Sequence, residues 1–294
     1  MKNKNNMKQT LKMKLINHYK PALALAAVCA ALWNVAVQAQ PAVSVYDMDD
    51  SFVLNPGPGN GSYPNAASQN FGGMNSRSVA SPTAHPGNNP ANPSKGEFDS
   101  VLRFDFSSTV ATLNSEYGVG DWSISSLSLT LNTSSTVGNS MFNSPGTSGN
   151  FNVSWLSNDG GWIQGTGSQS PASYTGITYN SLQSTLSATP ATLLNTCSYV
   201  AQGTLVPATY SVSTANTGFV SALMSGDSIS LLLTPADNQV AFNFTSHSYS
   251  SGSNPALYSP TLSFDIAVVP EPATATMIAG GLLLLCVRCR SRRA

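Results

Sequence analysis

Residues 122–131 read WSISSLSLTL and give the clearest indication of the fold. Apolar side chains recur at every second position, which is the period of a β-strand with one face on a core and one in water. The period changes phase once, because the apolar residues are first even-numbered and then odd-numbered: Trp122 and Ile124, then Leu127, Leu129 and Leu131. One extra residue at Ser125-Ser126 keeps both halves facing the core, so the pattern predicts a β-bulge there.

The same alternation recurs in four other parts of the chain. Their apolar members are Leu102, Phe104 and Phe106; Phe151, Val153 and Trp155; Val240, Phe242 and Phe244; and Leu262, Phe264 and Ile266. The intervening residues, such as Val101 and Arg103, are expected to face water. Residues 228–234 (SISLLLT) are apolar almost throughout and predict a strand in the middle of a sheet.

One short helix is predicted over residues 217–225, where apolar side chains recur four positions apart and Gly226 follows as a C-terminal cap. Residues 235–238 (PADN) predict a tight turn between two antiparallel strands. We therefore expect an all-β fold, an antiparallel β-sandwich of jelly-roll-like form with this one helix. Residues 40–269 form a single domain in this interpretation, with a Pro- and Gly-rich loop region over residues 55–96.

Charge is distributed unevenly along the chain, although 13 Lys+Arg and 13 Asp+Glu give a formal net charge of zero. Six lysines lie in the first 20 residues, and four arginines lie near the C-terminus, Arg288, Arg290, Arg292 and Arg293. Between these ends, residues 40–269 contain three basic and twelve acidic residues. This excludes a nucleic-acid-binding role, because there is no Lys/Arg surface to neutralise phosphates.

The N-terminus has the organisation of a secretory signal peptide. A lysine-rich segment, residues 1–20, precedes an apolar run over residues 21–37 and a cleavage point between Ala39 and Gln40. The apolar run is shorter than the roughly 20 residues of a membrane span, which favours cleavage over a permanent anchor. We therefore expect residues 1–39 to direct export through the secretion machinery and then to be removed.

The C-terminal residues 270–294 have three parts. Pro270, Glu271 and Pro272 come first, an apolar stretch over residues 273–287 follows, and the four arginines come last. As a helix, the apolar stretch would be about 22 Å long. Because the hydrocarbon core of a bilayer is roughly 30 Å thick, this is a marginal transmembrane helix, and the arginines would hold its end on the cytoplasmic side.

This tail resembles the PEP-CTERM sorting signal of Gram-negative bacteria that produce extracellular polysaccharide. The resemblance rests on Pro270, Glu271 and Pro272, on the short apolar helix and on the basic end, in that order. It implies transient anchoring in the inner membrane, recognition by an exosortase (a membrane-embedded transpeptidase-like enzyme), and release or attachment of the passenger at the cell surface. The alternative is a simple C-terminal anchor. Both interpretations place residues 40–269 outside the inner membrane.

The order of patterns in residues 42–266 is similar to that of the DNRLRE (carbohydrate-binding module 96-like) β-sandwich family. The matching segments are residues 104–106, 127–131, 153–155, 161–167, 228–234, 240–246 and 259–262. The family occurs in bacterial surface and polysaccharide-associated proteins, so the resemblance implies a carbohydrate-binding passenger. Ile163 and Gln164 stand where the family usually has a charged residue, which departs from the family's pattern.

Residues for catalysis are scarce. Outside the signal peptide the histidines are His85 and His247, and no H-E-x-x-H or G-x-S-x-G motif is present. The glutamates of the domain are Glu97 and Glu116, so the carboxylate pair of a glycosidase would come mostly from aspartates. Cys197 is the only cysteine of residues 40–269, and we expect it to pack in the core.

An opening strand is predicted near residues 43–46. Asp47, Asp49 and Asp50 follow it and are the candidate metal ligands. Their oxygen atoms could bind Ca²⁺, helped by backbone carbonyls. A solvated acidic turn is the simpler interpretation of the same residues. No cofactor other than Ca²⁺ is expected.

Trp162 is the candidate residue for carbohydrate contact. It lies among glycines and is the tryptophan best placed for exposure, where its ring could stack on a sugar. Trp122 and Trp155 fall in the apolar phase of their strands and are expected in the core.

Together these features predict an exported envelope protein, sorted by an exosortase to the cell surface or the extracellular matrix of a biofilm. The passenger is expected to be non-catalytic, with a structural or polysaccharide-contacting role. The alternative is a secreted polysaccharide-active hydrolase or lyase, which a cleft lined by two or more carboxylates would favour. A third candidate is a protein-binding or adhesion module, which an exposed apolar patch or open edge strand would favour.

Overall fold

The computed structural model describes residues 42–58, 65–84, 96–134, 142–143, 148–249, 257–268 and 281. Several predictions fall outside these residues: the signal peptide with its cleavage point at Ala39 and Gln40, and, apart from Gly281, the sorting signal from Pro270 to the terminal arginines. In the part of the chain that is described, no helix is both long and apolar enough to cross a membrane.

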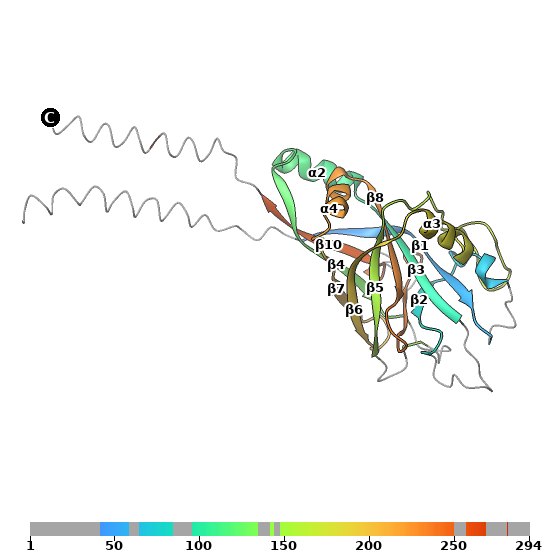
Figure 1. Cartoon of the computed structure of the whole chain (residues 1–294). Coiled ribbons are helices and arrows are strands. Elements are labelled where there is room, and N and C mark those ends of the chain that lie inside the picture. The colour runs from blue at the N-terminus through green and yellow to red at the C-terminus, as the bar shows by residue number, and fades with distance from the viewer. Residues whose placement is uncertain are drawn as a thin grey trace, which may run out of the picture. The chain divides into compact units, whose positions relative to one another are not determined.

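The described residues are predominantly β-strand, and their strand pairings are antiparallel. The strands are β1 (Val43–Pro56), β2 (Ser76–Ala80), β3 (Gly96–Asp105), β4 (Trp122–Asn132), β5 (Ser148–Leu156), β6 (Thr192–Val200), β7 (Pro207–Ser211), β8 (Ser228–Pro235), β9 (Ala241–Thr245) and β10 (Thr261–Val268). The helices are the short 3₁₀ helix η1 (Ala66–Ser68) and the α-helices α2 (Ser107–Tyr117), α3 (Tyr179–Ala188) and α4 (Thr217–Ser225). The expected all-β fold class is confirmed (Figure 1).

The long strand β1 belongs to two parts of the sheet. The strand order is β6-β5-β8-β3-β1-β10-β4-β7, and β2 joins β3 to β9 beside this path. Residues 43–46 of β1 pair with β10, whereas residues 47–56 pair with β3. The sheet therefore continues through β10, β4 and β7 from the first part of β1, and through β3, β8, β5 and β6 from the second.

Strand β4 contains the predicted bulge. Asp265 of β10 lies opposite Ser126, and the next residue of β10 lies opposite Ile124. Ser125 is therefore the extra residue, and it is exposed. The apolar residues before and after it, Trp122 among them, are directed to the core. The phase change read from the sequence is confirmed.

The main core cluster receives side chains from both parts of the sheet. Leu129 and Phe264 come from β4 and β10, and Phe104 and Leu231 come from β3 and β8. Each large apolar side chain that is fully buried contributes about 1.5–3 kcal/mol. Cys197 lies in the same cluster, where burial raises the pKa of its thiol to about 11, and this agrees with a packing role.

The other face of β3 and β8 is also covered. Val53, Val101 and Leu232 lie in a second cluster together with Trp162 and residues of α3. This explains the continuous apolar pattern of residues 228–234, since β8 lies between β3 and β5, as predicted. The expectation that Val101 faces water is wrong, because the chain that follows β5 returns across this face.

Helix α4 and its left-handed C-terminal residue, Gly226, occur as predicted. The prediction of a single helix is wrong, since α2 and α3 are also present and α2 packs against α4 (Figure 1). Helix α2 buries only Val110 and Leu113, and its Ser- and Thr-rich sequence has weak helix propensity. Helix α3 starts with a reciprocal cap between Thr178 and Ser181. A serine replaces the usual Glu or Gln of such a cap, so the start signal is inconspicuous.

The Pro- and Gly-rich region, residues 55–96, contains regular structure. Besides η1 it includes β2, which pairs with β9 along residues 76–80. The predicted turn at residues 235–238 leads from β8 into β9, and these two strands run in opposite directions. They do not pair with each other, because β9 pairs with β2. Because β2 pairs with β9, Arg77 of β2 lies opposite Phe244 and its charged side chain is buried in the interior.

Candidate functional site: a buried cluster of carboxylates, arginine and histidine

A second β-bulge, in β1, decides which aspartates reach the interior. Asp47 lies opposite Phe104 of β3, and Asp49 lies opposite the preceding residue of β3, so Met48 is the extra residue. Cross-strand partners share a face of the sheet, and Phe104 belongs to the main core. Asp47 therefore faces the interior. After the bulge the alternation resumes, which turns Asp50 to the interior and Asp49 to the opposite face.

Asp50 and Arg77 form an ion pair in the interior. Both side chains are 0% exposed, and Nη2 of Arg77 donates to Oδ1 of Asp50 at 2.5 Å. The same guanidinium donates to the backbone carbonyls of Asp50, Gly72, Met74 and Ser76. These carbonyls orient the guanidinium, so that its charge is held against Asp50.

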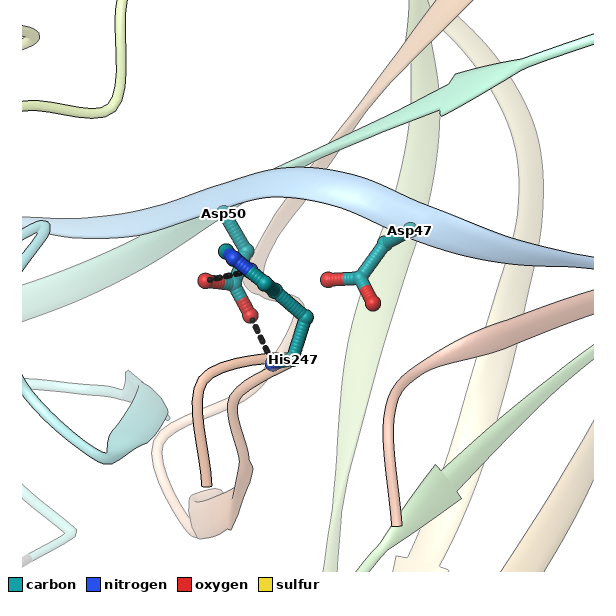
Figure 2. A group of neighbouring side chains, drawn as sticks. All are labelled: Asp47, Asp50 and His247. Carbon is teal, nitrogen blue, oxygen red and sulfur yellow. Dashed lines mark hydrogen bonds and ion pairs between the residues drawn. The ribbon is translucent and has the colours of Figure 1, made fainter. Parts of the chain in front are cut away.

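The turn after β9 supplies further partners to Asp50. The backbone N–H of His247 donates to Oδ2 at 2.9 Å, and the hydroxyl of Ser246 donates to Oδ1 at 2.9 Å. Nδ1 of His247 lies 3.0 Å from Oδ1 (Figure 2). Burial acts to raise the pKa of Asp50, but the Arg77 guanidinium and His247 outweigh it and hold that pKa well below its usual range. Asp50 is therefore ionised at neutral pH, and its Oδ1 is fully engaged.

Asp47 is the member of the cluster whose partners are missing. It is 6% exposed, and neither of its carboxylate oxygens receives a hydrogen bond within the described part of the chain. Its carboxylate points toward Asp50 and His247 (Figure 2). Burial raises the pKa of Asp47, and the adjacent charge of Asp50 raises it further. Two such carboxylates are stable side by side only with a proton or a cation between them.

The structure brings together two of the three aspartates considered for Ca²⁺. Asp47, Asp50 and His247 each offer a ligand atom, and these atoms lie within 4.8 Å of one another. Asp49 is not part of this group, because it lies on the opposite face with Oδ2 3.1 Å from Nη1 of Arg103. The donor set is therefore two carboxylates and an imidazole.

Sequence reasoning missed Arg77 and His247 as members of this site. A phase change in β1 offered a signal for the bulge, since the early apolar residues such as Val45 are odd-numbered, whereas Phe52 and Leu54 are even-numbered. No comparable signal marks His247, which meets Asp50 across 197 positions of sequence. Only the pairing of β2 with β9 places it there.

Trp162 does not present an exposed ring. It is 7% exposed, and its Nε1 donates to Oγ of Ser230 at 3.0 Å. The guanidinium carbon of Arg103 lies 4.4 Å from the centre of the ring. The expectation of an exposed Trp162 is wrong, because its turn folds the ring onto the sheet instead of lifting it into solvent.

A cavity of about 390 Å³ lies beside this turn, and Trp155, Asp159 and Asp227 are among its lining residues. Two of its lining residues carry carboxylates, which is the feature that the hydrolase or lyase alternative requires. Burial acts to raise the pKa of Asp159, but hydrogen bonds from Ser230 and Arg103, among others, lower it overall. An ionised Asp159 is unsuited to be the proton donor of a catalytic carboxylate pair.

The exposed side of β1, β10, β4 and β7 carries two rows of hydroxyl groups, which we call the hydroxyl face. The rows consist of Ser44, Ser263, Ser128 and Ser211, and of Tyr46, Thr261, Thr130 and Thr209. Hydroxyl oxygens lie 2.8 Å apart between Ser44 and Ser263, and 2.9 Å apart between Thr130 and Thr209. Tyr46 is 51% exposed at one end of its row. The face offers uncharged donors and acceptors at the spacing of neighbouring strands, about 4.8 Å.

No model of a known protein family matches this chain, and no curated protein matches it. The resemblances of the tail and of residues 42–266 to known families therefore stay predictions.

Proposed function

We propose that the chain is an exported envelope protein whose passenger, residues 40–269, is a non-catalytic module that contacts extracellular polysaccharide. In this proposal the sheet is a jelly-roll-like sandwich, and the contact is made by the hydroxyl face. The observation that carries the proposal is the pair of hydroxyl rows crossing four adjacent strands.

A face of this kind suits a polymer better than a single sugar. Each hydroxyl exchanges a hydrogen bond to water for one to the ligand, so the net gain is only about 0.5–1.5 kcal/mol. A polysaccharide presents many equivalent hydroxyls along its length, and repeated contacts raise the overall affinity. The exposed ring of Tyr46 adds an apolar surface with a polar tip at one end of the row.

The engagement of the arginines favours a neutral polymer. The side chain of Arg77 is 0% exposed and paired with Asp50. The side chain of Arg103 is 12% exposed and bonded to Asp49 and Asp159. Neither arginine is free to bind the carboxylates or sulfates of an acidic polysaccharide, and the third basic residue of the passenger, Lys95, lies outside the described residues. We therefore propose a neutral glycan as the ligand.

Binding can be tested with the full chain in mild detergent, by measuring its retention on cellulose and on a neutral galactomannan, with alginate as the acidic comparison. Replacing three threonines by valine (T130V/T209V/T261V) removes hydroxyls but keeps β-branched side chains. We expect this variant to lose at least tenfold in affinity. Thr196→Val is the matched control, because Thr196 is also an exposed strand threonine with a side-chain bond, to Asn152 at 2.7 Å. Unchanged binding by the triple variant, or a preference for alginate, would refute the proposal.

The tail supports the sorting part of the proposal, through Pro270, Glu271, Pro272, the apolar stretch and the terminal arginines. An exosortase would recognise this tail at the inner membrane before the passenger reaches the surface. Mass spectrometry of the mature C-terminus tests the processing step. Surface-exposed protein that still carries Arg292 and Arg293 would contradict tail removal.

A hydrolase or lyase is the second candidate, and the cavity lined by Asp159 and Asp227 favours it. The same binding assay decides this point if the supernatant is analysed for new reducing ends and unsaturated products. Product formation that is lost in Asp159→Asn and Asp227→Asn would overturn the non-catalytic assignment. Retention of polymer without products supports the binding module.

A further inference from the structure

Asp47 needs either a proton or a cation, because the described side chains do not pair with its carboxylate. It is almost completely buried, and both of its carboxylate oxygens lack a donor within the described residues. Leaving a carboxylate buried and unpaired is strongly unfavourable. The carboxylate is aimed at Asp50 and His247, which are themselves able to bind a cation (Figure 2).

We propose that Asp47, Asp50 and His247 bind one Zn²⁺ ion. Their ligand atoms lie within 4.8 Å of one another. Zinc bonds to oxygen and nitrogen of about 2.0–2.2 Å hold tetrahedral ligand atoms roughly 3.4 Å apart. Side-chain movements of about 1 Å are therefore enough to close the three groups around one ion, with water as the fourth ligand.

The existing hydrogen bonds leave the right atoms available. Oδ1 of Asp50 accepts hydrogen bonds from Arg77 and Ser246, whereas its Oδ2 accepts only the backbone N–H of His247. Oδ2 is therefore the oxygen that an ion can share. Nδ1 of His247 lies 3.0 Å from Oδ1 of Asp50, so in the tautomer that is protonated at Nε2 the lone pair of Nδ1 is held beside the carboxylate and is available to a metal. The side chain of His247 is 27% exposed and gives the ion a path from solvent.

The donor set favours zinc over calcium. Ca²⁺ takes six to eight oxygen ligands, whereas an imidazole nitrogen with two carboxylates suits the zinc class of ions. When both carboxylates are ionised, they and the Arg77 guanidinium together carry one net negative charge, which attracts a dication. The same guanidinium opposes the ion at short range, so we expect moderate affinity.

The ligands join two separate parts of the fold. Asp47 and Asp50 flank the bulge of β1, and His247 lies in the turn after β9. An ion held between them would tie that turn to the strand that connects the two parts of the sheet. Binding should therefore raise thermal stability, independently of any contact with polysaccharide.

The test uses the full chain with Cys286→Ser and Cys289→Ser, because the C-x-x-C pair of the tail could bind zinc itself. This parent protein is stripped with a chelator and titrated with Zn²⁺, Ca²⁺ or Mg²⁺. Bound metal is measured by equilibrium dialysis, and Tm by thermal unfolding. We expect one Zn²⁺ per chain and a rise in Tm of several degrees.

Two variants locate the ion. Asp47→Asn keeps the shape of the side chain and removes its charge, and His247→Gln removes the nitrogen ligand. Each should weaken zinc binding at least tenfold and abolish the rise in Tm. Asp99→Asn is the matched control, since Asp99 is 4% exposed and also has an oxygen without a partner among the described residues, but faces the second cluster beside Val53. It should bind zinc as the parent does.

Three results would overturn the proposal. Zinc binding of parental strength in Asp47→Asn would place the ion elsewhere. Binding of Ca²⁺ in preference to Zn²⁺, unaffected by His247→Gln, would refute the ligand set. Failure of the parent to bind zinc would leave a proton as the counter-charge of Asp47.

Discussion

The side chains of Arg77 and Asp50 are joined at 2.5 Å in the interior, where neither is exposed to water. Arg77 lies in β2 and Asp50 lies in β1. These two strands do not pair with each other, but each of them pairs with β3. A buried ion pair adds little stability compared with a well-packed apolar pair, but the loss of one partner leaves an uncompensated charge. The pair therefore makes the interior sensitive to single substitutions.

Arg77→Met should lower the free energy of unfolding by about 3–5 kcal/mol, because Asp50 is then buried without its cation. The double variant D50N/R77M should recover part of this loss, since no charge is left behind. Urea unfolding of the two variants and the wild type measures both effects. A single variant within about 1 kcal/mol of wild type would show that the pair is not needed.

Asp99 should make stability depend on pH. Burial raises the pKa of Asp99, and the charge of Glu97 raises it further. A carboxyl group whose folded pKa is raised stabilises the protein below its unfolded pKa, about 3.9, and this contribution is lost as the pH rises through the folded pKa. Asp99→Asn should therefore be more stable than wild type at pH 8, and this advantage should shrink as the pH falls. A difference of one between the folded and unfolded pKa values of Asp99 corresponds to about 1.4 kcal/mol.

Urea unfolding between pH 5 and pH 8 measures this difference. Glu97→Gln is a useful second variant, because it removes the charge that raises the pKa of Asp99 in addition to burial. In this background Asp99→Asn should change stability by a smaller amount. A difference between Asp99→Asn and wild type that stays constant over the whole range would contradict the assignment.

Deletion of Ser125 should be severely destabilising, although its side chain is exposed. Without the extra residue, the strand alternation turns Trp122 and Ile124 away from the core. Exposure of these side chains should cost about 3 kcal/mol or more. Ser125→Ala keeps the bulge and should lie within about 0.5 kcal/mol of wild type. Chemical unfolding distinguishes them, and a deletion as mild as the substitution would refute the role of the bulge.

Gly72→Ala should destabilise the wall of the candidate site. A Cβ atom at this position would lie 1.9 Å from the carbonyl oxygen of Gln164. Because that oxygen belongs to the backbone, the main chain has to shift to make room for the methyl group. Overpacking of this kind costs about 1–3 kcal/mol. Gly203→Ala is the control, because its Cβ would meet nothing nearer than a methyl group of Val206 at 3.7 Å. We expect a fall in Tm for the first variant only, and equal Tm values would contradict the crowding argument.

The strands were predictable where one face of the sheet is buried and the other is exposed to solvent. The alternation of Leu262, Phe264 and Ile266 and the phase change at Ser125 both correspond to the observed register. Helices α2 and α3 were not predictable in this way, since each buries few side chains and lacks a strong cap signal. The candidate site was partly predictable, because two of its aspartates were identified and its arginine and histidine were not.

The sequence by itself determined the strand periodicity, the bulge in β4, the central position of residues 228–234 and the helix that ends at Gly226. These features depend on residues that are close together in the sequence, because the backbone geometry of a strand or helix sets the direction in which each successive side chain points. Only the tertiary structure decided that Trp162 is buried, that Asp49 turns away from Asp47 and Asp50, and that Arg77 and His247 meet Asp50. These outcomes depend on which distant strands pair, and pairing is selected by burial of the whole core, which no local pattern encodes.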